Sequence, residues 1–288
     1  MSRRLAFAGA ILASLLAGSA SAQQSPEDPR LAQVLAALQP QRPGVVDAYV
    51  IAVALDSDPV FNREAREAGR VLAQRFDAAG RTIVLAADDG GDQAQSFGSP
   101  PHLAQALSRA AALMDLKEDV LVLYSTSHGS PRAGINYRDV QRSSAAIITP
   151  AQLAAILDER RFENRLLILQ ACFSGQFVPA LSAPHTVIAT AASATRSSFG
   201  CSAGNDWTFF GHALVNQALR QPDTFQRQFR RAFVTIYGWE KKLGIDPSDP
   251  QISIGKDSGR WLTALDARAP KLASQPVGQP PSELTQQP

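Results

Sequence analysis

Two stretches decide how we interpret this sequence: VLVLYSTSHG at residues 120–129 and LLILQACFSG at residues 166–175. Each begins with a run of apolar side chains and ends in small and polar residues. A short, unbroken apolar run is typical of a β-strand that is covered on both faces. His128 in the first stretch and Cys172 in the second therefore each lie just beyond the end of a predicted buried strand.

Similar apolar runs surround these two stretches, at residues 49–55, 82–87 and 186–190, with a short last candidate strand at 251–254. Segments with helical spacing separate them, at 61–79, 101–116, 150–161, from 207 onward, and from 222 to about 243. Thr149, with Gln152 three residues later, predicts an N-terminal cap for the third of these helices. Alternating strands and helices predict an α/β fold, with a mostly parallel sheet of about six strands and helices on both faces. Functional side chains of such sheets gather at the carboxyl ends of the strands.

The composition excludes several classes of protein. Hydrophobic residues make up 45% and charged residues 19% of the chain, as in ordinary globular proteins. The formal net charge is only +2, so we expect no nucleic-acid partner. Two cysteines are too few for a disulfide scaffold or a Cys-rich zinc site, and no nucleotide-binding loop follows a strand. The acidic run at 88–92 lacks the spacing of an EF-hand and is interpreted as a solvated turn. We therefore predict no metal and no cofactor.

The two ends of the chain differ from its middle. Arg3 and Arg4 precede an apolar run at 5–18, and residues 20–22 (ASA) fit a cleavage site. This pattern predicts a signal peptide over 1–22 and export to the periplasm or the extracellular space, without stable membrane insertion after cleavage; an uncleaved membrane anchor is the alternative. Residues 23–46 are a lead-in segment and 47–265 one domain. Residues 266–288 are rich in Pro and Gln, and we expect them to be disordered. The sequence does not determine the oligomeric state.

The pairing of a histidine with a cysteine has a chemical use. If the two strands are neighbours, about 4.8 Å apart, both side chains face one gap. His128 can then take the proton of the Cys172 thiol and later protonate a leaving amine. The backbone N–H groups of Gly129 and Cys172 are candidates for an oxyanion hole. Two other interpretations stay open: Cys172 as a small buried side chain, or as one half of a disulfide with Cys201.

These motifs resemble those of the legumain-like cysteine peptidases, the asparaginyl endopeptidase family, whose fold is related to that of caspases. The shared pattern is a hydrophobic strand ending in His-Gly and a second strand ending in Ala-Cys-x-Ser-Gly. Further along come TAA at 190–192, SSFGC at 197–201 and DW at 206–207. The resemblance covers about residues 48–243. It implies a caspase/legumain-like three-layer sandwich for the domain at 47–265 and, with the predicted signal peptide, an exported member of bacterial type.

The resemblance also implies the roles of individual residues. Cys172 is the expected nucleophile and His128 the expected general base and acid, with Gly129 and Cys172 supplying the oxyanion hole. Cys201 corresponds to a family cysteine outside this pair, which disfavours the disulfide. The pocket for the residue before the scissile bond is expected to be lined by four side chains, Ser197, Asp206, Gln170 and Arg63.

The chain departs from the family pattern at two places. Gln170 stands where eukaryotic members carry Glu, which removes one charge from the expected pocket. The loop at 56–63 matches the family's Asn-x-Arg-His element poorly, with Arg63 as the candidate arginine and Glu64 in place of the histidine. The third residue of the family, which orients the histidine, is therefore not assigned.

The sequence thus predicts a cysteine endopeptidase, a hydrolase that acts on peptides or proteins through an acyl-enzyme. Water then hydrolyses this intermediate, or another amine accepts the acyl group, as in a transpeptidase. Asparaginyl specificity is what the resemblance implies. Two alternatives stay open: a non-catalytic binding module on the same fold, and an esterase or amidase that uses the same dyad.

Overall fold

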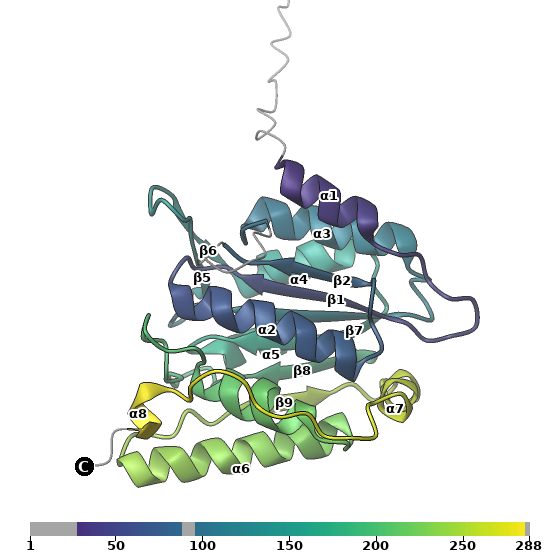
Figure 1. The fold of residues 1–288 in the computed structure, drawn as a ribbon. Helices are drawn as coiled ribbons and strands as arrows, with labels where there is room; N and C mark the ends of the chain where they lie inside the picture. The colour runs from purple at the N-terminus through teal and green to yellow at the C-terminus, as the bar shows by residue number, and fades with distance from the viewer. Residues whose placement is uncertain (1–27, 88–95, 286–288) are drawn as a thin grey trace, which may run out of the picture.

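The computed structural model describes residues 28–87 and 96–285 (Figure 1). The predicted signal peptide and the acidic run at 88–92 lie outside the described residues. The centre is a six-stranded sheet in the order β2-β1-β3-β7-β8-β9, parallel at every pair except β8–β9. The mostly parallel sheet is therefore confirmed. Its strands are β1 (Ala48–Ala54), β2 (Thr82–Leu85), β3 (Val120–Thr126), β7 (Asn164–Gln170), β8 (Thr186–Thr190) and β9 (Gln251–Ile254).

Helices cover both faces of this sheet, because alternate residues of each strand point to opposite sides. Val50 and Ala52 of β1 belong to one hydrophobic core, while Tyr49, Ile51 and Val53 belong to the other. The first core is covered by α2 (Pro59–Arg75), the π-helical η2 (Gly211–Gln217), η3 (Ala218–Arg220), α6 (Phe225–Leu243) and α7 (Gly259–Ala267). The second is covered by α1 (Pro29–Ala37), α3 (Pro100–Leu113), α4 (Pro150–Glu159), η1 (Ser174–Phe177) and α5 (Val178–Leu181). The result is a three-layer α/β sandwich.

Local sequence explains where several helices begin. Helices α1 to α4 each have proline in the first turn, where its missing N–H costs nothing. The predicted cap at Thr149 is present as a full capping box with Gln152. Two predicted boundaries were wrong. Helix α2 ends at Arg75 rather than 79, because Asp77 has a positive φ of 53°. The helix predicted from 207 has its regular π-helical part only from Gly211, because Thr208 is drawn into bonds with Glu64.

A second, three-stranded antiparallel sheet follows His128 directly and was not predicted. It consists of β4 (Gly129–Ser130), β5 (Gly134–Arg138) and β6 (Ala145–Ile148). Ile135 and Ile148 pair across β5 and β6 and are buried in the second core. The strands are too short for their alternation to stand out in the sequence. This small sheet extends the molecule beside the carboxyl ends of the central strands, at the left of Figure 1.

The buried carboxylate of Asp119 joins the starts of β1 and β3. It accepts backbone N–H groups of Asp47 and Asp115, both at 2.8 Å, and burial raises its pKa to about 6. Because the folded state holds this proton more tightly than the unfolded state, stability falls as pH rises from about 4 to about 6. We expect the free energy of unfolding of the wild type to fall by up to about 3 kcal/mol over this range relative to Asp119→Asn. Urea unfolding of both proteins at several pH values checks this; parallel pH curves would contradict it.

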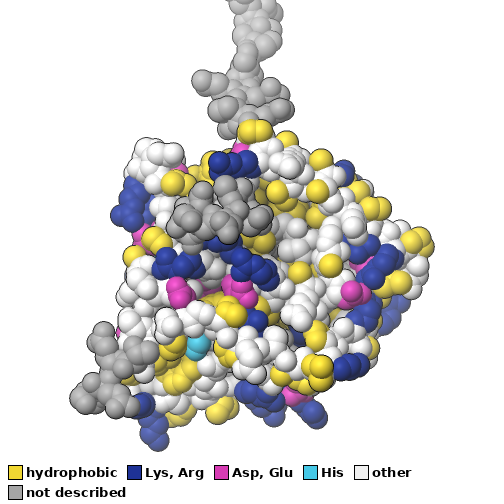
Figure 2. All heavy atoms as spheres, in the orientation of Figure 1, with side chains coloured by type: hydrophobic (Ala, Val, Ile, Leu, Met, Phe, Trp, Pro, Cys, Tyr) yellow, Lys and Arg dark blue, Asp and Glu magenta, His cyan; other side chains and the backbone are white. Residues whose placement is uncertain are grey.

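The described surface is mixed in character. Figure 2 shows basic side chains in several separate clusters, with acidic side chains beside some of them.

Among the described helices, none combines the length and the apolar character that crossing a membrane requires.

Candidate active site

His128 and Cys172 lie at the same edge of the central sheet. Strands β3 and β7 are parallel neighbours with Thr126 opposite Gln170, so both residues come two positions beyond an aligned pair. The chain after His128 passes against Cys172: a Cβ on Gly129 would lie 2.0 Å from the Cys172 carbonyl oxygen. Only glycine allows this approach, which explains the His-Gly pair. The parallel strands therefore bring together the two residues that the sequence predicted as a dyad.

His128 is held by Asp58, a residue that the sequence analysis did not assign. The imidazole Nε2 lies 3.1 Å from Asp58 Oδ2, and the Phe61 ring packs against the imidazole in a T-shaped arrangement at a centroid distance of 4.9 Å. Asp58 is the N-cap residue of α2, yet its side chain makes no capping bond. Its carboxylate instead contacts His128 and two arginines, Arg138 and Arg142. With Nε2 engaged, Nδ1 is the nitrogen left for proton exchange with a thiol.

The thiol of Cys172 is in contact with Ser198. The Ser198 N–H donates to Sγ at 3.4 Å, and Sγ lies 3.5 Å from the Ser198 carbonyl oxygen. None of the hydrogen bonds found in the described ranges joins Cys172 to His128. Catalytic hydrogen bonds of this kind are often long until substrate binds. In this state the thiol and the imidazole thus face one site without a direct bond.

The turn after Cys172 leaves its amide available. Phe173 has a left-handed φ of 59°, and its N–H donates to Arg196 O at 2.8 Å. Gly175 donates to Ala192 O at 2.9 Å, and a Cβ there would lie 2.6 Å from the backbone nitrogen of Ala194. No hydrogen bond among the described residues uses the Cys172 N–H. This N–H is therefore free to face an oxyanion, the role that the sequence predicts for it together with the N–H of Gly129.

Cys201 differs from Cys172 in its surroundings. Both cysteines are free, so the structure does not contain the disulfide that the sequence left open. Burial raises the pKa of the Cys201 thiol well above its usual range. A thiol that stays protonated is a poor nucleophile. Cys172 is therefore the candidate nucleophile of the two.

Two polar side chains, Gln170 and Glu64, are fully buried near the ends of β3 and β7. The Gln170 side chain has no exposed surface; its Oε1 lies 3.0 Å from Thr126 Oγ1, while its Nε2 has no hydrogen-bond partner. Glu64, also fully buried, accepts bonds from Tyr124, Thr126 and Thr208, and burial raises its pKa. The Gln170 amide is thus fully buried, and it lies beside the Cys201 thiol. Glu64 holds Thr208 against β3, a role that its place beside Arg63 in sequence does not reveal.

The predicted pocket residues Arg63 and Asp206 form an ion pair. Arg63 Nε lies 3.2 Å from Asp206 Oδ1, and the guanidinium also donates to the carbonyl oxygens of Ala203 and Asn205. Ser197, in contrast, is exposed, and the next residue, Ser198, is the serine that contacts Cys172. The role of Ser197 in the pocket therefore stays a prediction.

The tail predicted to be disordered is ordered through Thr285. Figure 1 shows it in yellow, running from α7 across the α6 layer to α8 (Ser282–Thr285). Val277 O accepts from Trp207 Nε1 and from Asn216 Nδ2, both at 2.9 Å. Gln279 N donates to Asp206 Oδ2 at 2.7 Å. The prediction was wrong because polar groups of the domain, rather than apolar side chains of the tail, hold this segment in place.

Removing this tail is expected to loosen the pocket wall at 205–207. A chain that ends after Ala273 loses several side-chain hydrogen bonds, each contributing about 1 kcal/mol, and leaves the buried Trp207 indole N–H without an acceptor. We expect its Tm to fall by about 5 °C or more. A chain ending after Thr285 retains these bonds and serves as the control. Equal melting temperatures for the two chains in thermal unfolding would contradict the prediction.

The group of Asp56, Asp58 and His128 has ligand atoms within 4.8 Å of one another, a spacing that metal sites also show. Both carboxylates are already ion-paired, however, since Arg138 contacts both and Arg142 contacts Asp58. A cation there would face two guanidinium groups. We therefore assign these carboxylates to the orientation of His128 and Arg138.

Comparison with known proteins adds a family match. The sequence profile of the Peptidase C13 family matches residues 102–260, more than half of the chain and a range that includes His128 and Cys172. No curated protein sequence matches the chain significantly. Among solved structures, the crystal structure of caspase-1 from Spodoptera frugiperda is similar, at 12% sequence identity and a TM-score of 0.47. That match covers 76% of this chain and 94% of the caspase chain.

Proposed function

The chain belongs to the peptidase C13 family of cysteine peptidases, and from this premise we propose that it is an endopeptidase that works through Cys172 and His128. The observation that carries the proposal is the common position of these residues at the ends of β3 and β7, with Asp58 on the far nitrogen of the imidazole. Peptides or proteins are the substrates. The three-layer sandwich is the caspase-related fold expected of such an enzyme.

The proposed reaction begins with transfer of the Cys172 proton to His128 Nδ1. The thiolate attacks the peptide carbonyl carbon, and the N–H groups of Cys172 and Gly129 stabilise the oxyanion. The imidazolium then donates its proton to the leaving amine, and the C–N bond breaks to give a thioester on Cys172. Water, deprotonated by His128, hydrolyses the thioester and regenerates the thiol. An amine that reaches the thioester first forms a new peptide bond instead.

We further propose that the residue before the scissile bond carries a side-chain carbonyl oxygen, as Asn and Asp do. Gln170 Nε2 is a buried donor beside the Cys201 thiol that has no oxygen or nitrogen partner, and such a group disfavours ligands that offer it no acceptor. Arg63 is the second donor expected in the pocket; among the described residues only its Nη1 makes no hydrogen bond, since Nε and Nη2 donate to the carbonyl oxygens of Ala203 and Asn205. Asp206, the candidate acceptor, already accepts from Gln279 and pairs with Arg63. The surplus of donors supports recognition of an oxygen rather than of a cationic side chain.

A peptide library scanned at the position before the scissile bond tests both parts of this proposal. Cleavage by the wild type after Asn or Asp, and none by Cys172→Ala, is the expected result. Cleavage after basic residues would contradict the proposed pocket, and cleavage that persists in Cys172→Ala would contradict the proposed nucleophile.

Export is a separate proposal that rests on residues 1–22. Sequencing the amino terminus of the protein isolated from its native cells tests it, with Gln23 as the expected first residue. A chain that begins at Met1 would contradict cleavage.

A further inference from the structure

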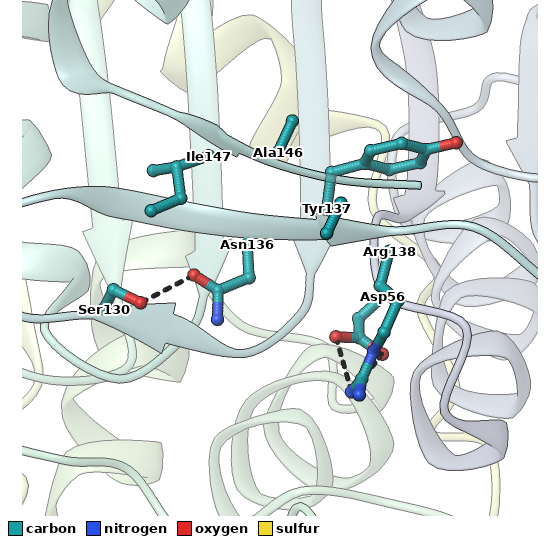
Figure 3. A pocket seen from close by; sticks show the side chains of 8 residues that line it. Asp56, Ser130, Asn136, Tyr137, Arg138, Ala146 and Ile147 are labelled. Carbon is teal, nitrogen blue, oxygen red and sulfur yellow. Dashed lines mark hydrogen bonds and ion pairs between the residues drawn. The ribbon is translucent and has the colours of Figure 1, made fainter. Parts of the chain in front are cut away.

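One face of the small sheet β4–β5–β6 is open to solvent beside His128. Residues paired directly across neighbouring strands share a face. The pairs Asn136–Ile147 and Arg138–Ala145, together with Ser130, therefore lie on one side. The opposite side carries Ile135 and Ile148, which are buried. Together with Asp56, Tyr137 and Ala146, the open side lines a pocket of about 420 Å³ (Figure 3).

This pocket adjoins the histidine side of the dyad. Ser130 follows His128 by two residues, and Asp56 precedes the His128 partner Asp58 by two residues. The Cys172 thiol contacts Ser198, and neither residue lines the pocket. In the proposed reaction the acyl part of the substrate is bonded to Cys172, whereas the leaving amine receives its proton from His128. The part of the substrate beyond the scissile bond must therefore depart on the side of this pocket.

The polar groups of the pocket are fixed by partners but leave donors unused. Ser130 Oγ donates to Asn136 Oδ1 at 2.8 Å, and Arg138 Nη2 donates to Asp56 Oδ2 at 3.0 Å; Figure 3 shows both interactions. Among the described residues, no hydrogen bond uses Asn136 Nδ2 or Arg138 Nη1. Asp56 is buried and its charge is compensated by Arg138. The groups left for a ligand are thus N–H donors and the hydroxyl of Tyr137.

Beside these donors lies an apolar wall. Ala145 and Ile147 project onto the same face from β6, and Ile147 is 42% exposed although it is a large aliphatic residue. A surface with N–H donors on one strand and aliphatic groups on the next suits an extended peptide, which offers carbonyl oxygens and side chains in alternation. It does not suit a Lys or Arg side chain, because Arg138 repels a cation and the one carboxylate among the described lining residues, Asp56, is already paired.

We propose that this face binds the substrate segment that follows the scissile bond, and that it selects uncharged or acidic residues there over basic ones. The inference rests on the proposed peptidase function. It assigns Asn136, Arg138 and Ile147 to recognition of the leaving peptide. In acyl transfer the same face would hold the incoming peptide amine.

The test compares two substrates with the same acyl part. One is a peptide that extends four residues beyond the scissile bond, and the other is an aminocoumarin amide, which has no residue there. Arg138 is not a clean target, because it also holds Asp58. The informative variants are Ile147→Glu and Asn136→Ala. Val140→Glu is the matched control, since Val140 is 48% exposed in the same hairpin and does not line the pocket.

We expect Ile147→Glu to lower kcat/KM about tenfold for the extended peptide and less than about twofold for the aminocoumarin amide. Asn136→Ala should act in the same direction by about threefold or more, and Val140→Glu should change neither value. With Lys on the leaving side, Ile147→Glu should cleave faster than the wild type. Equal effects on both substrates, or no effect on either, would overturn this inference and leave the peptidase intact. Failure of the wild type on both substrates would instead overturn the proposed function and, with it, this inference.

Discussion

Cys172→Ala is expected to lower kcat/KM for peptide cleavage by about 10³-fold or more. Without the thiol no acyl-enzyme forms, and the remaining groups only bind and polarise the substrate. Cys201→Ala is the matched control, because this variant also removes one thiol from the same edge of the sheet. We expect its activity to stay within about threefold of the wild type, since the partly buried Cys201 thiol, whose pKa is raised, stays protonated and packs as a small apolar group.

Activity measured with one peptide substrate, alongside thermal unfolding of each protein, separates chemistry from stability. Cys172→Ala should remain folded, because Cys172 is only partly buried and its contacts to Ser198 are weak. Equal loss of activity in the two alanine variants would mean that both thiols matter. Retained activity in Cys172→Ala would show that another side chain is the nucleophile.

Substitution of Asp58 is expected to cause the second large loss of activity. Asp58→Asn should lower kcat by about 100-fold with little change in KM. The carboxylate at 3.1 Å holds the proton of His128 on Nε2, so that Nδ1 stays free for the thiol, and it stabilises the imidazolium that forms during the reaction. An amide at this place lacks the negative charge and also presents an N–H group to the ring.

Asp139→Asn is the control for Asp58→Asn. Asp139 lies in the turn after β5 and bonds locally to Ser143 and Ser144. Steady-state kinetics should show no loss of activity for this control. An increase of KM without a fall of kcat in Asp58→Asn would mean that Asp58 acts in substrate binding through Arg138 and Arg142, rather than through His128.

The sequence predicted the central sheet well, because its strands are buried on both faces. In β1, β3 and β8 every residue is buried, so the apolar runs are unbroken and cannot be confused with amphipathic helices. That β3 and β7 are neighbours was only a condition of the prediction, and the structure meets it, which places His128 near Cys172. The apolar runs of the sequence were therefore sufficient to predict the central strands.

Features that depend on distant partners were not predictable in this way. Asp58 resembles an ordinary helix cap in sequence, and only the fold brings His128 to its carboxylate. The tail after Ala269 has few apolar residues, and its order depends on donors of Trp207 and Asn216 from another part of the chain. Composition reports what a segment can bury, but it does not report which polar groups elsewhere need a partner.

The small sheet β4–β5–β6, on which we place the leaving peptide, was also not predictable from the sequence. Its strands have two, five and four residues, too few for a clear alternation. Its position is set by the buried pair Ile135–Ile148 and by the bridge of Asp56 to Arg138. The surface on which we place the leaving peptide could therefore be recognised only in three dimensions.

Trapping of the acyl-enzyme tests the central claim most directly. The wild type is mixed with an excess of a cleavable peptide, quenched in acid within the first turnovers, and digested for mass spectrometry. We predict that the acyl part of the peptide is attached to Cys172 as a thioester, in the wild type and in Cys201→Ala, and is absent from Cys172→Ala. An acyl group on any other residue, or peptide cleavage in the Cys172→Ala protein, would contradict the account.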